Sequence, residues 1–408
     1  MRTIGFVLFL STLLAAFPAT PRQQDGADTP SSTNYLARAR QAIDRHHYAT
    51  AQALMDSALR TVGFHPSLVC PMVANVLDHH YLQRDFQVFY LRDEGGADSL
   101  LAPVVAVRYP DRLLERALRD HPHLGWLHEL RGHYLRLKLE QTRPHDPQLA
   151  EQTAAAYQRA VQNGIRSLRV FAWLGGYYVD QNRPRLAQEM LEAALNLDSG
   201  HVLANFHLAR LSFRERRYSQ AYASARNALG GDSLLQPVQR YDATRMMALS
   251  LANLGETDRF VDYIVECIRQ LPDIQAGYLD LIDHYTAIGR ERDILRGLYR
   301  EMLLRNPYDQ AGYKHLERYA VGTEDFAHAE RILEEILANY EHADEAVGNV
   351  YRFRGNLLFR QGRFEEARTL WDISRSYYAR CLPPDSPLLK EIGQISLNTS
   401  ANGRGPNP

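Results

Sequence analysis

The chain repeats one pattern of apolar and polar positions six times between Leu168 and Cys381. Each copy has an apolar stripe spaced for one face of a helix, a short polar break and a second stripe of the same kind. The anchors that begin the second stripes are 34, 39, 34, 35 and 38 residues apart, and they are Ala187, Ala221, Phe260, Ile294, Ala329 and Ala367. A period near 34 residues predicts helical hairpins. Because one hairpin cannot bury its apolar face alone, we expect the hairpins to stack into an elongated array.

The copy at 167–200 shows the pattern most clearly. Phe171, Leu174 and Tyr178 fall on one helical face, and the small residue Gly175 beside them lets a partner helix approach closely. Residues 182–184 break the pattern. The stripe of the second helix then follows at intervals of four and three residues, with Ala187, Leu191 and Ala194.

This copy resembles the tetratricopeptide repeat (TPR) family. The first helix of that repeat carries an aromatic residue, Leu, Gly and Tyr, and the second carries Ala, an aromatic residue, Ala and Pro. Later copies keep parts of this signature, among them Leu208, Ala209, Tyr218, Met247, Ala248, Leu251, Tyr278, Leu281, Tyr313, Leu316, Tyr351 and Gly355. The resemblance implies an all-α fold, a TPR-type helical-hairpin solenoid wound as a right-handed superhelix with a concave surface.

The repeat pattern weakens toward the N-terminus. Residues 127–381 are expected to form the TPR array, and residues 34–126 a set of degenerate TPR-like hairpins, all counted as one solenoid. Within the degenerate part, 68–121 is apolar and is expected to be helical, although it holds the pattern poorly. A cluster of Asp, Gly and Ser predicts a loop at 92–99.

Both ends of the chain carry signals of their own. At the C-terminal end, prolines stop the last repeat helix, 382–397 is expected to add a short capping helix, and 398–408 is expected to be a disordered tail. At the other end, Arg2 precedes an apolar run of fourteen residues, which is short for a bilayer.

We therefore expect 1–20 to be a signal peptide and 21–33 a flexible leader. The protein would then be periplasmic or secreted, with no stable membrane insertion after cleavage. The alternative is an uncleaved, membrane-associated helix.

Composition bounds the possible partners. The chain is 45% hydrophobic and 23% charged, with a net charge of -1, so its bulk charge does not favour nucleic acid, which usually requires a basic domain. Of 47 basic residues, only three are lysines: Lys138, Lys314 and Lys390. Arginine suits paired contacts with carboxylates, but a GC-rich genome produces the same bias.

No catalytic or metal-binding constellation withstands inspection. His128 and His133 resemble a zinc-protease motif that is one residue too long, and five residues place two side chains about 140° apart on a helix. Phosphate-loop, dinucleotide and serine-nucleophile signatures do not occur. Three cysteines predict no disulfide framework, and Cys267, at a core position of its repeat, is expected to be buried. We expect no enzyme, no cofactor and no metal.

The resemblance places a binding surface on the first helix of each repeat. In the TPR family the concave wall consists of the first-helix positions outside the core stripe. Mapped onto this chain, the wall is basic and aromatic, with an acidic patch at Asp280 and Asp283. The side chains expected to bind a partner are Trp173, Phe206, Arg210, Phe213, Arg214, Arg245, Lys314, Arg318, Arg352, Asn356 and Arg360.

This wall predicts a protein-binding scaffold that holds an extended, partly acidic peptide or a chain end of a partner protein. Arg352 and Asn356, four residues apart, resemble one pair of the family's carboxylate clamp. Two alternatives remain open. Individual arginines can pair with acids of adjacent helices instead, or the protein is a structural or assembly subunit of a cell-envelope complex that binds through its convex face or edges. Partner identity and oligomeric state are also open.

Overall fold

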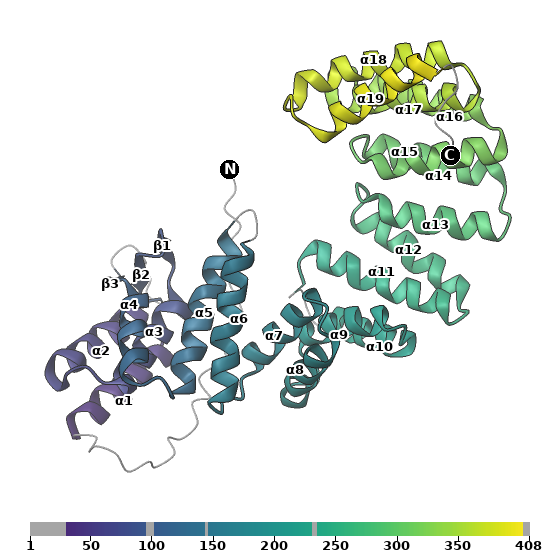
Figure 1. Cartoon of the computed structure of the whole chain (residues 1–408). Helices are drawn as coiled ribbons and strands as arrows, with labels where there is room; N and C mark the ends of the chain where they lie inside the picture. The colour runs from purple at the N-terminus through teal and green to yellow at the C-terminus, as the bar shows by residue number, and fades with distance from the viewer. Residues whose placement is uncertain (1–29, 95–101, 143–145, 231–234, 403–408) are drawn as a thin grey trace. The chain divides into compact units, whose positions relative to one another are not determined.

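A computed structural model describes residues 30–94, 102–142, 146–230 and 235–402, and most of them are helical (Figure 1). The predicted fold class, an all-α TPR-type array of helical hairpins, is confirmed. Instead of one continuous body, however, the chain divides into two compact units, Met1–Val170 (unit 1) and Phe171–Pro408 (unit 2). The expected boundary at 126/127 lies inside unit 1.

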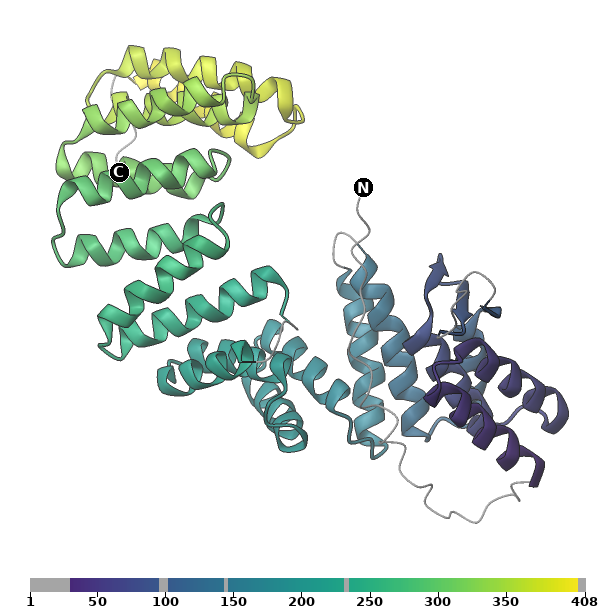
Figure 2. The same ribbon diagram turned by 180° about the vertical axis from the view of Figure 1, so that it is seen from behind.

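In its described part, unit 2 contains six consecutive helical hairpins followed by one more helix, as Figure 2 shows from behind. Helix α7 begins just before the unit boundary. The first and second helices of the hairpins alternate along the chain: α7 (Leu168–Asp180), α8 (Pro184–Leu197), α9 (Val202–Arg214), α10 (Tyr218–Leu229), α11 (Pro237–Asn253), α12 (Thr257–Gln270), α13 (Gln275–Ala287), α14 (Arg292–Arg305), α15 (Gln310–Thr323), α16 (Phe326–Asn339), α17 (Asp344–Arg360), α18 (Phe364–Cys381) and α19 (Pro387–Asn402).

The predicted anchors of the second helices are correct with one exception. In each second helix the fourth residue is buried in the core, and five of these residues are predicted anchors: Ala187, Ala221, Phe260, Ala329 and Ala367. In α14 the fourth residue is Leu295, which is buried, whereas the predicted anchor Ile294 is 38% exposed. The prediction was wrong by one residue because both neighbours are large and apolar and spacing alone does not separate them.

Glycines on first helices permit the close crossings that the sequence predicted. A Cβ on Gly175 would lie 2.5 Å from Cδ2 of Leu191 on the partner helix α8. A Cβ on Gly355 would lie 2.6 Å from Cδ1 of Trp371 on α18. Since real side-chain atoms do not approach so closely, the larger residue on the second helix occupies space that only glycine leaves free.

The described residues of unit 1 form three helical hairpins, and a small sheet interrupts the second one. The first hairpin is α1 (Pro30–Asp44) with α2 (Tyr48–Val62), and the third is α5 (Gly125–Gln141) with α6 (Pro147–Gln162). The second pairs α3 (Pro66–His79) with α4 (Pro110–Asp120). Between these two helices lie the strands β1 (Leu82–Arg84), β2 (Val88–Arg92) and β3 (Val104–Arg108).

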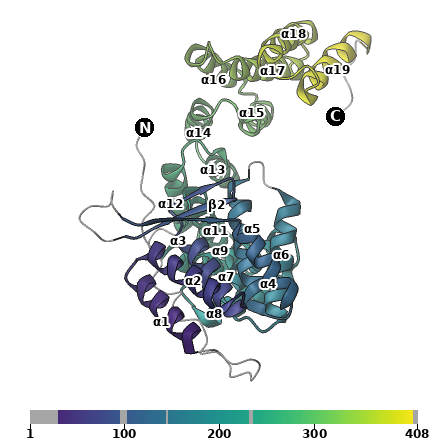
Figure 3. The same ribbon diagram turned by 90° about the vertical axis from the view of Figure 1, so that its left-hand side faces the viewer.

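The sheet corrects the expectation that 68–121 forms helical hairpins joined by a loop at 92–99. Its strands are antiparallel in the order β1-β2-β3, and the register pairs Phe89 with Val107 and Tyr90 with Ala106. Phe89, Leu91 and Val107 alternate with less buried residues and are buried on the face against α2 and α3 (Figure 3). The apolar content that suggested helix therefore has period two in this segment, which is the spacing of a half-buried strand.

The ends of the described chain also differ from expectation. Residues 30–33, predicted as leader, are the first turn of α1, and 1–29 lie outside the described residues. Helix α19 begins later than the predicted cap and continues through 398–402, predicted to be disordered, because its buried residues Leu389 and Ile392 anchor it and no proline follows its first residue within the helix. Residues 403–408 and most of the predicted loop at 92–99 lie outside the described residues, while Arg92 ends β2.

Candidate functional site

The first helices of unit 2 form a surface on which ion pairs join one helix to the next. We call the surface made by α7, α9, α11, α13, α15, α17 and α19 the first-helix face. Four of its six consecutive intervals are bridged by an arginine–carboxylate pair in the described structure. The pairs are Arg210–Asp180 at 2.6 Å, Arg245–Asp280 at 2.5 Å, Arg360–Glu317 at 3.0 Å and Arg352–Glu391 at 2.7 Å.

A fifth interval, between α13 and α15, has a weaker bridge. His315 Nδ1 lies 3.9 Å from Asp283 Oδ1, and the Arg318 guanidinium hydrogen-bonds the other ring nitrogen, Nε2, at 2.6 Å. Burial first, and then the positive charge of Arg318, lower the pKa of His315. The imidazole is therefore neutral at pH 7, and its attraction for Asp283 is small.

The interval between α9 and α11 lacks such a bridge among the described residues. Helix α9 presents Arg210 and Arg214, and α11 presents Asp242 and Arg245, but no ion pair joins the two helices. Arg214 donates only to the backbone oxygen of Val179, at 2.6 Å. Helix α11 begins with a capping box in which the side chains and backbone of Gln236 and Gln239 bond reciprocally, and this stabilises the start of the helix that carries Asp242 and Arg245.

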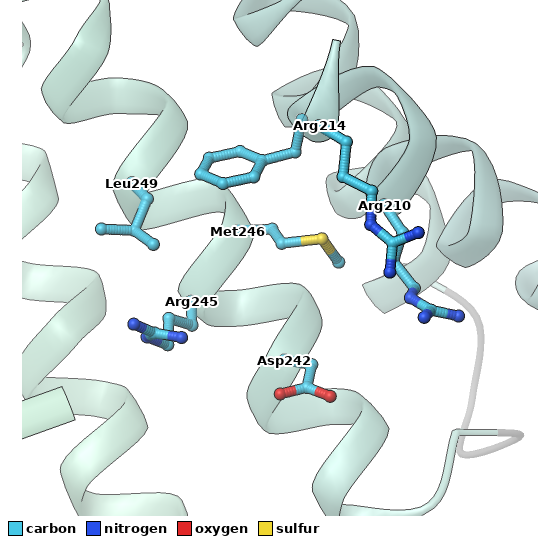
Figure 4. Close-up of a pocket in the computed structure, with 7 residues that line it drawn as sticks. Arg210, Arg214, Asp242, Arg245, Met246 and Leu249 are labelled. Atoms are coloured by element: carbon cyan, nitrogen blue, oxygen red, sulfur yellow. The ribbon is translucent and has the colours of Figure 1, made fainter. Parts of the chain in front are cut away.

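These side chains surround a pocket, which we call the α9–α11 pocket (Figure 4). Its volume is about 190 Å³, which suits one or two side chains rather than a drug-sized ligand. In Figure 4 Arg210 and Arg214 lie on one side, Asp242 and Arg245 on the other, and Met246 lies between them. The complete lining is Arg210, Phe213, Arg214, Asp242, Arg245, Met246 and Leu249.

The polar groups of the pocket differ in how firmly they are held. Arg245 donates two hydrogen bonds to Asp280, and this pairing raises its pKa further above the usual value. Partial burial raises the pKa of Asp242, although Arg210 and Arg245 oppose that shift. Burial, and after it the positive charge of the neighbouring Arg210, lower the pKa of His207 to about 4. Arg214 is the exposed cation whose donors remain the most available.

The structure brings four of the predicted binding residues together in this pocket: Arg210, Phe213, Arg214 and Arg245. It also adds Asp242, Met246 and Leu249, which the sequence analysis missed. Helix α11 starts at Pro237, so Asp242 and Leu249 are its sixth and thirteenth residues. Seven residues apart, they lie on one helical face, and that face can be assigned only once the start of the helix is known.

Two other predicted residues are not on the surface. Phe206 is buried in a core cluster with Val202 and Ala228, so the prediction that it contacts a partner is wrong. Arg352 is also buried, at 7% exposure, with its guanidinium bonded to Gln310 and Glu391. Its ion pair with Glu391 joins α17 to α19, and α19 packs where a further repeat would stack.

The remaining predicted residues lie on other parts of the first-helix face. Asn356 donates to Glu317 and accepts from the Trp371 indole, so the clamp-like pair of Arg352 and Asn356 has intramolecular partners. Arg360 pairs with Glu317 as well. Trp173 stacks on Tyr177 with ring centroids 5.4 Å apart, and Lys314 and Arg318 are exposed on α15.

The histidines flagged by the sequence lie in different surroundings. His128 Nε2 is 2.7 Å from the backbone oxygen of Pro122, whereas His133 contacts Arg169 and Asp78. Within the described ranges no group of three or more His, Cys, Asp or Glu is arranged to hold a metal ion. Cys70 and Cys267 are buried thiols, as predicted for Cys267, and Cys381 is an exposed one. No described helix is both long and apolar enough to cross a bilayer.

Neither a protein-family model nor a curated protein matches the chain. Among solved structures, it is similar to PilF of Pseudomonas aeruginosa, at 19% identity over 52% of this chain and 93% of that chain, with a TM-score of 0.40. It is also similar to PilW, titled a widely conserved type IV pilus biogenesis factor (14%, 62% and 99%, TM-score 0.39). A third is YrrB, titled a TPR protein with an unusual peptide-binding site (16%, 41% and 79%, TM-score 0.34). The fold assignment rests on the hairpins of this chain itself.

Proposed function

We propose that the protein is a non-catalytic scaffold that holds a peptide segment of a partner protein in the α9–α11 pocket. One observation carries the proposal: of the intervals along the described first-helix face, this one is crossed by neither an arginine–carboxylate pair nor a contact such as His315–Asp283, and its charged side chains line a pocket. A carboxylate of the partner would pair with the arginines here, as carboxylates of the chain itself do in the neighbouring intervals.

The chemistry of the pocket selects an acidic residue next to an apolar one. Free donors of Arg214, with Arg210 beside it, would bind the carboxylate, and Phe213, Met246 and Leu249 would surround the apolar side chain. A charge-assisted hydrogen bond contributes about 1.5–3 kcal/mol, and full burial of a large apolar side chain contributes a similar amount. Part of this is lost in ordering the peptide, so an affinity in the micromolar range is expected.

Binding of a labelled peptide to purified variants tests the proposal. The probe is a fluorescein-labelled hexapeptide with Glu next to Phe, followed by fluorescence anisotropy. Arg214→Glu should weaken binding at least about tenfold, since it replaces the donor with a repelling charge. Arg318→Glu, an equally exposed site on α15, is the matched control and should bind like wild type. Equal binding by wild type and Arg214→Glu would refute the pocket assignment.

The sequence predicted a binding surface that extends beyond the α9–α11 pocket. A combined variant distinguishes binding along the whole first-helix face from binding in the pocket alone. If the whole face binds, replacing Arg210, Arg214 and Arg318 together should weaken binding further than replacing Arg210 and Arg214 alone. The pocket proposal expects no added loss from Arg318, because α15 is two hairpins further along the chain.

Export is the second part of the proposal. The apolar run before residue 20 supports a cleaved signal peptide, and the protein would meet its partner outside the cytoplasm. Intact-mass spectrometry of the protein purified from its own host tests this. A mass that lacks about the first 20 residues is expected, and full-length protein in the cytoplasmic fraction would contradict it.

A further inference from the structure

The outer edge of the sheet in unit 1 has hydrogen-bonding groups without partners in the described structure. Strand β3 is at the end of the order β1-β2-β3. The backbone amide of Tyr109 donates to Gln87 and that of Asp93 donates to Pro103, which fixes the alternation of the β2–β3 ladder. Val105 and Val107 therefore bond toward β2, and the N–H and C=O groups of Val104, Ala106 and Arg108 point to the open side.

The face of the sheet turned away from the helices is basic and partly apolar. We call this the outer sheet face, and its residues are Leu82, Arg84, Val88, Tyr90, Arg92, Val104, Ala106 and Arg108. Val104 is 55% exposed and Leu82 is 53% exposed, so both apolar side chains are available on this face. The three strands contain three arginines and no carboxylate.

The arginines of the outer sheet face form no ion pairs within the described part of the chain. Arg84 and Arg108 flank Val88 in one cross-strand row, and neither has an ion pair among the described residues. Arg92 stacks over the ring of Tyr81, 5.0 Å from its centroid, and has no carboxylate partner in the described part of the chain. The acidic neighbours lie at the strand ends: Asp93 is held by Thr50 through two hydrogen bonds, while Asp85 and Glu94 are exposed.

We infer that an extended acidic segment of a partner protein adds to β3 as a fourth strand. The free backbone groups of β3 would bond the segment, as sheet edges do in β-strand addition. Alternate side chains of the added strand would lie on the outer sheet face, where carboxylates would meet Arg108 and Arg92, and the apolar side chains between them would lie on the opposite face. Pro103 and Pro110 bracket the edge and limit the segment to about five paired residues.

Charge decides between an acidic segment and a second copy of this chain. If two β3 edges paired around Ala106, the outer sheet faces would become continuous and six arginines would lie on one surface without a carboxylate from the strands. Like charges at this spacing repel, and they suppress such pairing. An acidic strand instead neutralises the face while it satisfies the same backbone groups.

The experiment uses the full chain and a labelled nonapeptide in which Glu and Val alternate, with binding followed by fluorescence anisotropy. Hydrogen exchange should slow across 102–110 when the peptide is bound. Ala106→Pro removes one outward N–H without touching the β2–β3 ladder, and it should weaken binding about tenfold or more. Arg108→Glu should weaken it to a similar extent, whereas Arg119→Glu, on exposed α4 surface, should not.

A second probe keeps the protein unchanged in case Ala106→Pro disturbs the fold. The same nonapeptide, N-methylated at every second residue so that it cannot bond β3, should not bind. Equal affinity of the methylated and unmethylated peptides would overturn strand addition, and so would absence of binding to the wild type. Concentration-dependent dimerisation lost in Ala106→Pro would overturn the acidic occupant in favour of a second copy. A Glu–Val sequence also suits the α9–α11 pocket, so the peptide measurements are made in the Arg214→Glu background, which removes binding at the pocket and leaves the sheet untouched.

Discussion

The α9–α11 and α17–α19 intervals contain similar side chains and differ in what those side chains contact. In α17–α19, Arg352 is buried and bonded to Glu391 and Gln310. In α9–α11, Arg214 is exposed, has one backbone acceptor, and faces a pocket with apolar walls. A basic residue on the first helix of a repeat is therefore a structural group in one place and a candidate binding group in the other.

The difference shows that position in the repeat does not decide the role of an arginine. The role of an arginine depends on whether the neighbouring first helix has a carboxylate within ion-pair distance of it. Asp280 is that carboxylate for Arg245, and Asp180 is that carboxylate for Arg210. Helix α11 supplies only Asp242 opposite α9, and no ion pair forms there.

Removal of the buried arginine should have the largest effect. Arg352→Ala should destabilise the last hairpin and α19 by about 1–3 kcal/mol, less than for a fully buried pair because the Glu391 side chain is 54% exposed. The matched change Arg214→Ala should cost less than about 0.5 kcal/mol. Native-state hydrogen exchange measures the first change over 344–395 and the second over 202–253. Equal loss of protection in the two variants would erase the contrast between the intervals.

The α7–α9 interval should be sensitive to acid. Burial, with Arg210, lowers the pKa of His207 to about 4, below the ordinary value of 6.5. The unfolded chain therefore takes up the proton first, so stability is lost as the pH falls from about 6.5 to about 4. In His207→Asn the urea-unfolding midpoint should change less with pH over this range. Around pH 8, its change with pH should be the same as in wild type. A variant that loses stability with acid as steeply as wild type would exclude this histidine as the cause.

A smaller effect is expected from the carboxylate in the pocket. Asp242→Asn removes the negative charge that opposes an acidic ligand, so affinity for the Glu-Phe probe should rise about threefold. Asp283→Asn, on exposed α13 surface, serves as the control and should leave the affinity unchanged. Weaker binding by Asp242→Asn would mean that this carboxylate holds the ligand, which would reverse the assigned polarity of the pocket.

The smallest effect concerns the turns that set each first helix beside its partner. Arg216 has a left-handed conformation with φ 60°, where a Cβ is unfavourable, so Arg216→Gly should stabilise its hairpin by about 1 kcal/mol at most. Asn182, with φ 54° in the preceding hairpin, tolerates this conformation, and Asn182→Gly should be nearly neutral. Thermal unfolding followed by circular dichroism compares the two, and a larger gain for Asn182→Gly would contradict the explanation.

The hairpins were predictable because their core positions recur. Gly175 against Leu191, and Ala187 at the fourth position of its helix, follow from spacing alone. The sheet was not, because its apolar residues sit in a segment too short and too close to two apolar helices for the period to stand out. The pocket was predictable only in part. Arg210 and Arg214 fall at predicted wall positions, but whether they are free to bind a ligand depends on the carboxylates that neighbouring first helices place beside them.

Hydrogen exchange of the full chain with and without the Glu-Phe hexapeptide tests the central claim most directly. The α9–α11 pocket predicts slower exchange in 206–216 and 237–250, with 310–320 and 344–360 unchanged. Protection of those two later helices, with none at α9 and α11, would contradict the claim that the open interval is the binding site.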